Sequence, residues 1–165
     1  MLNNIYLVEG EIEEKIIKLL KEKYILSGKI HIIHQKLITN TLLRILKKYS
    51  NIIMIFDTDT SETYKTIKEN IKMLKKYKFQ VVLIPQVENI EDEIVYATDI
   101  KDIQKLLKSK SKGDFKSDFL NEKNCLKKLE EHQFSIERFW SRSPENSSKF
   151  SEFKNEGRKI KKKIT

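Results

Sequence analysis

The chain has 165 residues, of which 39% are hydrophobic, so it can bury the core of one domain but cannot form two domains of full size. It has no apolar run near the roughly 18 residues of a membrane span, no signal-peptide pattern and only one cysteine, Cys125. We therefore expect a cytoplasmic protein without membrane association, disulfide or cysteine-bound zinc. The formal net charge of +9 favours a polyanionic partner, and most of the excess lies in residues 99–165, which carry 18 basic and 11 acidic residues.

The first part of the chain alternates short apolar runs with amphipathic segments. The apolar runs predict strands at 4–8, 29–34, 51–56 and 79–84, the last ended by Pro85. Apolar residues at helical spacing predict helices at 11–26, 37–49 and 61–77. Strands that are apolar on both faces and alternate with helices are typical of a parallel sheet covered on each side. We therefore expect an α/β, Rossmann-like core over residues 1–98, with a mainly parallel four-stranded sheet flanked by helices.

The rest of the chain shows helical spacing and then loses it. Helices are predicted at 91–98, 100–107, 118–131 and 134–140, so residues 99–142 form a helical extension packed on the core. From residue 143 the sequence is rich in turn residues and ends in a basic run, which is typical of a flexible, solvated tail. The other interpretation of this run is an arm that binds nucleic acid.

Acidic residues follow three of the four predicted strands. Glu9 ends the first strand and Glu13 lies on the same face of the next helical turn, while Asp57 and Asp59 follow the third strand. After the fourth strand come Glu88, Glu91, Asp92 and Glu93. The carboxyl ends of parallel strands share one edge of the sheet, so these like charges would converge there and require compensation. Oxygen ligands without cysteine suit one or two Mg²⁺ or Mn²⁺ ions.

The Asp57-Thr58-Asp59 segment taken alone has a second interpretation. Asp59 or Thr60 can cap the helix that follows, as short polar residues do at many helix starts. Because Glu9 and Glu13 occupy the matching end of the first strand, we favour a metal site over a cap.

The pattern of Tyr6 to Gly10 with Glu13, followed after one βα unit by Ile53 to Asp59, resembles the Toprim domain of topoisomerases, primases and OLD-type nucleases. The resemblance covers about residues 4–98. It implies that Glu9 is a general acid/base or metal ligand and that Asp57 and Asp59 bind Mg²⁺. The nuclease branch further implies that Glu13 joins the metal shell, that Glu91 binds a second ion, and that a lysine after this segment takes part in catalysis, for which we choose Lys112.

The resemblance implies metal-dependent hydrolysis of nucleic-acid phosphodiesters, in DNA or RNA. No second domain fits in the remaining residues, so we do not expect a covalent tyrosine intermediate. Sequence-independent phosphate contacts are expected from Arg138, Arg142, Arg158, Lys159, Lys161, Lys162 and Lys163. For the two arginines beside Phe139 and Trp140, the other interpretation is an aromatic pair that packs on the core while the arginines stay solvated.

Two other functional classes stay open. One is a Toprim-like regulatory module that binds nucleic acid or a nucleotide for a partner ATPase, since the chain has no Walker motif. The other is a receiver-like or phosphatase-like Mg²⁺ domain, which also carries an aspartate at a strand end. Those folds do not require a glutamate after the first strand, so Glu9 distinguishes them from the Toprim interpretation.

Overall fold

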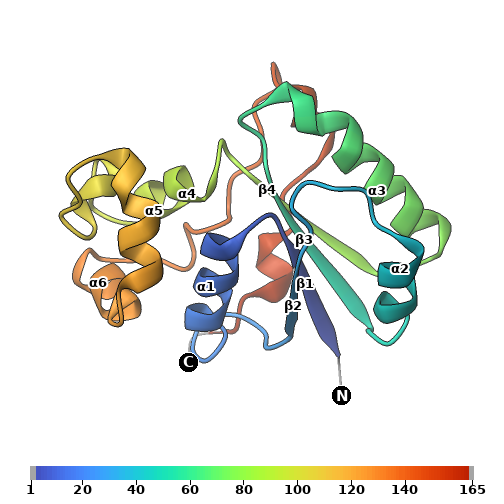
Figure 1. The fold of residues 1–165 in the computed structure, drawn as a ribbon, viewed down its shortest axis with the longest axis horizontal. Coiled ribbons are helices and arrows are strands. Elements are labelled where there is room, and N and C mark those ends of the chain that lie inside the picture. The colour runs from blue at the N-terminus through green and yellow to red at the C-terminus, as the bar shows by residue number, and fades with distance from the viewer. Residues whose placement is uncertain (1–2, 164–165) are drawn as a thin grey trace.

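The structure is a computed structural model that describes residues 3–163 (Figure 1). Four strands and six α-helices alternate through most of the chain: β1 (Asn4–Val8), α1 (Glu11–Leu20), β2 (Lys29–Ile32), α2 (Asn40–Leu46), β3 (Asn51–Asp57), α3 (Tyr64–Lys76), β4 (Val81–Gln86), α4 (Ile90–Tyr96), α5 (Lys112–Asn121) and α6 (Cys125–Glu131). No helix within residues 3–163 is long and apolar enough to cross a membrane.

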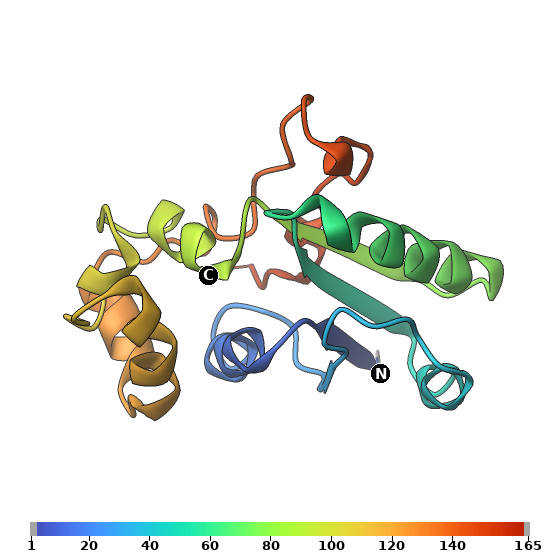
Figure 2. The same cartoon turned by 45° about the horizontal axis from the view of Figure 1, so that its top comes forward.

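The four strands form one sheet in the order β2-β1-β3-β4, and every neighbouring pair is parallel. The predicted α/β fold with a parallel four-stranded sheet is therefore confirmed. Helix α1 covers one face, while α2 and α3 cover the other (Figure 2). The connections from β1 to β2 and from β2 to β3 therefore run in opposite directions, which creates a topological switch point between the carboxyl ends of β1 and β3.

The period-two alternation of strand side chains divides the core into two layers. Tyr6 and Val8 pack with α1 and with the extension after residue 98, whereas Ile5 and Leu7 pack with α2 and α3. Helices α5 and α6 lie against the α1 side, so the extension shares one continuous apolar cluster with the sheet (Figure 1).

Several predicted element bounds are wrong, each for a physical reason. The predicted strand end at Ile84 moves to Gln86 because β4 is an edge strand. The backbone N–H and C=O of Leu83 face outward to Glu156, so Pro85, two residues later on the same side, removes no ladder hydrogen bond. The predicted helix 118–131 is two helices, and the predicted helix 134–140 is a run of turns.

The break between α5 and α6 depends on a distant lysine. Lys15 on α1 donates from Nζ to the carbonyl oxygens of Phe119, Leu120 and Glu122, which end α5. These carbonyls would have no partner at a helix end without such a donor. Helix α5 therefore ends where Lys15 of α1 can donate hydrogen bonds to its free carbonyl oxygens.

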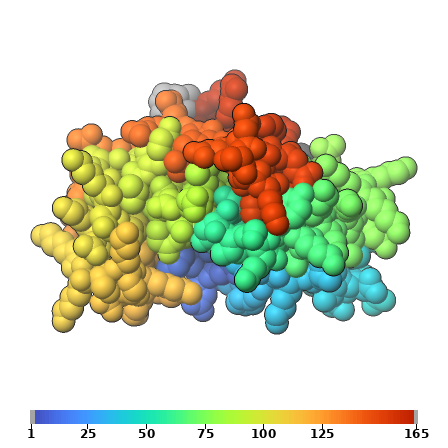
Figure 3. Space-filling view, turned by 90° about the horizontal axis from the view of Figure 1, so that it is seen from above, coloured from blue at the N-terminus to red at the C-terminus, as the bar shows by residue number. Residues whose placement is uncertain are grey.

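The predicted flexible tail is also wrong for residues 143–163, while residues 164–165 lie outside the described part of the chain. Phe150 and Phe153 are 2% and 6% exposed and pack on the α3 side of the sheet, and Ile160 is 1% exposed on the α1 side. Leu26 N donates to Ile160 O at 2.8 Å. Figure 3 shows the C-terminal segment lying between the extension and α3. This segment is part of the core.

The turn before β2 requires a glycine. A Cβ on Gly28 would lie 2.7 Å from the backbone oxygen of Asn4 in β1, which cannot yield without moving the strand. We expect Gly28→Ala to lower the free energy of unfolding by about 1–3 kcal/mol in urea denaturation. The matched control is Gly113→Ala in α5, where a Cβ meets nothing closer than 3.7 Å and alanine should stabilise the helix by about 0.5–1 kcal/mol. If Gly28→Ala and Gly113→Ala changed the free energy of unfolding equally, the close approach of Gly28 to Asn4 would be contradicted.

Candidate functional site

The switch point holds the acidic residues that the sequence pattern indicates. Glu9 follows the last residue of β1, and Asp57 is the last residue of β3, so parallel pairing places both at the same edge. A cavity of about 330 Å³ opens there, and Glu9, Glu13, Asp57 and Glu91 all line it. The acids from β1, α1, β3 and α4 are thus brought together in one place.

Glu9 lies in an environment that opposes its charge. Its side chain is 8% exposed, and burial raises its pKa from 4.5 to about 7, with Glu13 and Asp59 adding repulsion. Hydrogen bonds from the Gln35 side chain and the Asp57 backbone lower the pKa in part. Its Oε2 atom is buried and has no hydrogen-bond partner. A buried acceptor without a partner is rare and indicates a missing ligand or a functional group.

Asp57 is perturbed further in the same direction. Burial is the largest cause, followed by the charges of Glu13, Glu9 and Asp59, and together they raise its pKa from 3.8 to about 8. One hydrogen bond opposes this shift, donated by Gln86 Nε2 to Asp57 Oδ1 at 2.7 Å. The carboxylates therefore repel one another strongly when all are ionised.

Asp59 and Glu91 lie on the outer side of this edge. Both line a second cavity of about 550 Å³, which adjoins the first through Asp57 and Glu91. Burial raises the pKa of Glu91, while Asp59 is exposed and accepts from Asn89 Nδ2 at 3.5 Å. The residues before the following helical turns, Thr60 and Thr63, make no side-chain cap. The capping interpretation therefore has no support among these residues.

Lysines of the extension line the same two cavities. Lys112, the first residue of α5, lines the second cavity, and its Nζ lies 4.0 Å from Asp102 Oδ2. Lys116, one turn later on α5, lines the first cavity beside Glu9, and Lys101 joins Lys112 in the second. Helix α5 thus presents two positive charges toward the acidic edge, of which only Lys112 is predicted from the sequence.

Three polar residues of the site were missed from the sequence. His34 and Gln35 follow β2, have left-handed φ angles of 48° and 57°, and line the first cavity. Gln86 is fully buried at the end of β4, opposite Asp57 in the strand register. The rule that points to Glu9 and Asp57 applies to it too, but the strand was predicted to end two residues early.

The two arginines of the predicted nucleic-acid surface have partners within the chain. The guanidinium carbons of Arg138 and Arg142 lie 4.6 and 3.9 Å from the ring centre of Tyr96. Arg142 Nη2 also lies 3.7 Å from Oε1 of Glu93, whose side chain is fully buried. Phe139 and Trp140 are fully buried, so the packing interpretation of the aromatic pair is confirmed, although Arg142 is paired rather than solvated.

The predicted basic arm lies away from the acids. Lys162 donates from Nζ to the carbonyl oxygens of Lys21 and Glu22, just after the end of α1, and Lys161 donates to Glu137 O. Lys159 pairs with Glu156. Glu13 lies at the opposite end of α1, so the run cannot extend the basic surface beside the acidic edge. Arg158 and Lys163 are exposed and make no such contact with any of residues 3–163.

The donors of this edge fit a hard divalent cation. They are carboxylate oxygens, and one of them, Glu9 Oε2, accepts no hydrogen bond from residues 3–163. Among residues 3–163, no three His, Cys, Asp or Glu side chains already form a metal-binding group. Mg²⁺ commonly takes only one or two carboxylates and keeps several waters. Glu9 and Asp57 can supply the carboxylates, and the open cavity has room for the waters.

Comparisons of the chain with protein-family models, with curated proteins and with solved structures give no match.

Proposed function

We propose that this protein is a Mg²⁺- or Mn²⁺-dependent nuclease with a Toprim-like acidic edge, which hydrolyses phosphodiesters of DNA or RNA. The observation that carries the proposal is the buried, unpartnered Oε2 of Glu9 beside Asp57 at the switch point of a parallel sheet. Ligands bind at such points in open α/β sheets. The raised pKa values of Glu9 and Asp57, caused first by burial and then in part by the neighbouring carboxylates, also support a cation that would favour the ionised forms.

The residues divide into two roles under this proposal. Glu9 and Asp57 would hold the cation, with Glu13 beside them and Asp59 and Glu91 toward the outer cavity. A bound cation would activate water and neutralise charge on the scissile phosphate. In the metal-free protein burial raises the pKa of Glu9 to about 7, so Glu9 can exchange a proton near neutral pH when no cation holds it, as a general acid/base must.

The lysines of the extension support a phosphate-bearing substrate. Lys101, Lys112 and Lys116 line the cavities that the acids line, so positive groups surround a site whose centre is negative. Lysines at this position would attract the phosphates next to the scissile one, in a way that weakens with salt. The nucleic-acid surface is therefore assigned to α5 and the segment before it, not to the C-terminal basic run.

The proposal is tested by incubating the full chain with labelled single-stranded DNA, duplex DNA and RNA in Mn²⁺. We expect cleavage that chelation abolishes and that Glu9→Gln reduces by about 100- to 10,000-fold, the usual range for an acid/base residue. The isosteric Glu9→Gln keeps the shape of the site and removes only its charge. The matched control is Glu69→Gln on the exposed side of α3, which should cleave like the wild type.

Two results would contradict the proposal in different ways. Cleavage that persists in Glu9→Gln would place the chemistry outside this edge. Binding of nucleic acid with no cleavage in Mn²⁺ would favour the regulatory module, in which a partner ATPase supplies the activity.

A further inference from the structure

A hydrogen-bond chain joins the C-terminal extension to the acidic edge. Gln86 is fully buried at the end of β4 and pairs in register with Asp57. Its Nε2 donates to Asp57 Oδ1 at 2.7 Å and approaches Glu13 Oε1 at 3.4 Å. One neutral amide therefore bridges a carboxylate of β3 and a carboxylate of α1.

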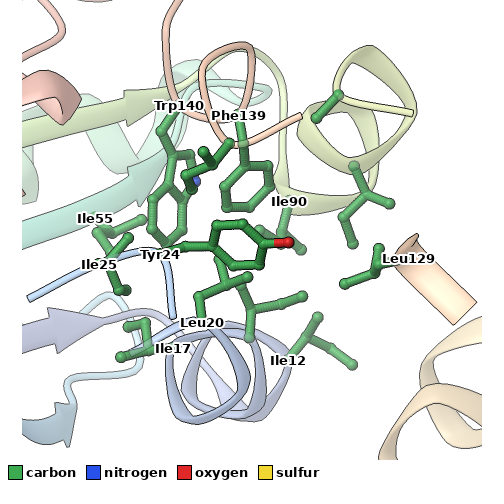
Figure 4. Packing of buried hydrophobic residues seen from close by; sticks show 14 of the residues in the cluster. Ile12, Ile17, Leu20, Tyr24, Ile25, Ile55, Ile90, Leu129, Phe139 and Trp140 are labelled. Carbon is green, nitrogen blue, oxygen red and sulfur yellow. The ribbon is translucent and has the colours of Figure 1, made fainter. Parts of the chain in front are cut away.

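Trp140 determines which way this amide faces. Its Nε1 donates to Gln86 Oε1 at 3.0 Å, and its ring is fully buried beside Phe139 and near Ile55 (Figure 4). An indole N–H can only donate, and an ionised carboxylate can only accept. If the amide were reversed, its oxygen would face Asp57 and its N–H groups would face the indole N–H. Both contacts would then be lost, so Trp140 holds the amide in the orientation that serves the acids.

The main chain of Trp140 is held by the C-terminal segment. A Cβ on Gly157 would lie 2.2 Å from the Trp140 carbonyl oxygen, so the two backbones are in direct contact. The Trp140 ring also packs against Phe139 at a tilt of 36°, with ring centres 4.3 Å apart. The position of the indole therefore depends on residues that lie far beyond the sheet in the sequence.

We propose that Gln86 and Trp140 are positioning residues that hold the Asp57 carboxylate for cation binding, so that the C-terminal extension completes the acidic site. This inference rests on the proposed function, because it takes Asp57 as a ligand. Groups that hold a metal ligand in place change metal affinity by about 10- to 100-fold when they are removed. Neither residue would touch the cation or the substrate.

The test measures Mn²⁺ binding to the full chain by calorimetry and records the Trp140 indole N–H resonance in metal-free protein by ¹⁵N NMR. Trp140 is the only tryptophan, so that resonance is unambiguous. We expect Gln86→Leu and Trp140→Phe each to weaken Mn²⁺ binding by about 10- to 100-fold. Asp57→Ala and Gln86→Leu should shift the indole resonance, because Asp57→Ala removes the acceptor of Gln86 Nε2 and Gln86→Leu removes the acceptor of the indole N–H. The matched control is Ile71→Val, a core change on the opposite face of the sheet, which should alter neither readout.

The results separate the positioning role of Gln86 and Trp140 from the existence of the metal site. If wild-type protein and Trp140→Phe bind Mn²⁺ equally, the positioning role is overturned and the metal site stands. If Trp140→Phe weakens Mn²⁺ binding but Asp57→Ala leaves the indole resonance unmoved, the loss of affinity is a general packing effect and the positioning role is again overturned. If the wild type itself binds no Mn²⁺, the proposed function fails and this inference fails with it.

Discussion

An Asp57→Asn substitution should abolish cation-dependent cleavage and, in metal-free protein, stabilise the fold at alkaline pH. Burial and the charges of Glu13, Glu9 and Asp59 raise the pKa of this carboxyl group to about 8. Asparagine keeps the oxygen that accepts from Gln86 but carries no charge. The substitution therefore removes the repulsion and the proposed ligand together.

The direction in which the free energy of unfolding changes with pH follows from the raised pKa of Asp57. Between pH 3.8 and about 8 the unfolded chain ionises Asp57 while the folded protein keeps the proton. The folded state then binds more protons, so wild-type stability is complete below pH 3.8 and is lost as the pH rises through about 8. The asparagine of the variant cannot ionise, so the variant escapes this loss. Each pKa unit corresponds to about 1.4 kcal/mol, so the rise from 3.8 to about 8 sets an upper limit of about 6 kcal/mol on the gain of the variant over wild type at pH 9.

The measurement is urea denaturation of both proteins at pH 5, 7 and 9 in the presence of a chelator. The gain should grow with pH, whereas Glu69→Gln, an exposed carboxylate on α3, should show no such trend. Added Mg²⁺ should stabilise wild type and leave Asp57→Asn unchanged, because a ligand stabilises only the state that binds it. A loss of stability in Asp57→Asn that is equal at every pH would assign Asp57 a structural role instead.

Ending the chain after Arg142 should unfold the protein. The removed segment includes Phe150 and Phe153, whose rings lie 6.4 and 5.7 Å from that of Phe56 in β3. It also includes Ile160, buried on the other face, and Glu156, which covers the open edge of β4. Loss of one buried phenylalanine side chain costs about 3–5 kcal/mol, and the whole fold is stable by about 5–15 kcal/mol. The truncated chain should lack the dispersed amide resonances of a folded protein.

A charge control separates packing from electrostatics in this segment. Arg158 and Lys163 are exposed, so replacing both with glutamine in the full chain removes two positive charges and leaves the buried side chains in place. This variant should fold with wild-type stability. A truncated chain that stays folded would instead show that residues 143–163 are a dispensable tail.

The sequence alone determined the sheet and the position of its acidic edge. Strands β1, β3 and β4 each contain a run of consecutive apolar residues, and alternation of strands with helices is typical of strands that all run the same way. Once the strands are parallel, the residue after each strand must lie at one common edge. The proximity of Glu9 and Asp57 is therefore predictable from the sequence, because it follows from chain direction and not from side-chain contacts.

Helix bounds in the extension depended on contacts that no local pattern contains. The periodicity of 118–131 favours one helix, yet Lys15, more than 100 residues earlier, supplies donors to the carbonyls where α5 ends. Gln86 was missed for a related reason, since Pro85 is tolerated because β4 is an edge strand and the nitrogen of Pro85 faces away from β3. In each case the tertiary surroundings changed the local preference.

The C-terminal segment is where tertiary structure alone decided the outcome. Its buried residues Phe150, Phe153 and Ile160 lie in or directly beside short 3₁₀ helices, so their spacing matches neither a strand nor an α-helix. Its lysines look like a solvated arm in the sequence, but Lys162 binds backbone carbonyls after α1. Irregular segments bury apolar side chains only against a surface that distant residues have already formed, so their burial leaves no periodic signal in the sequence.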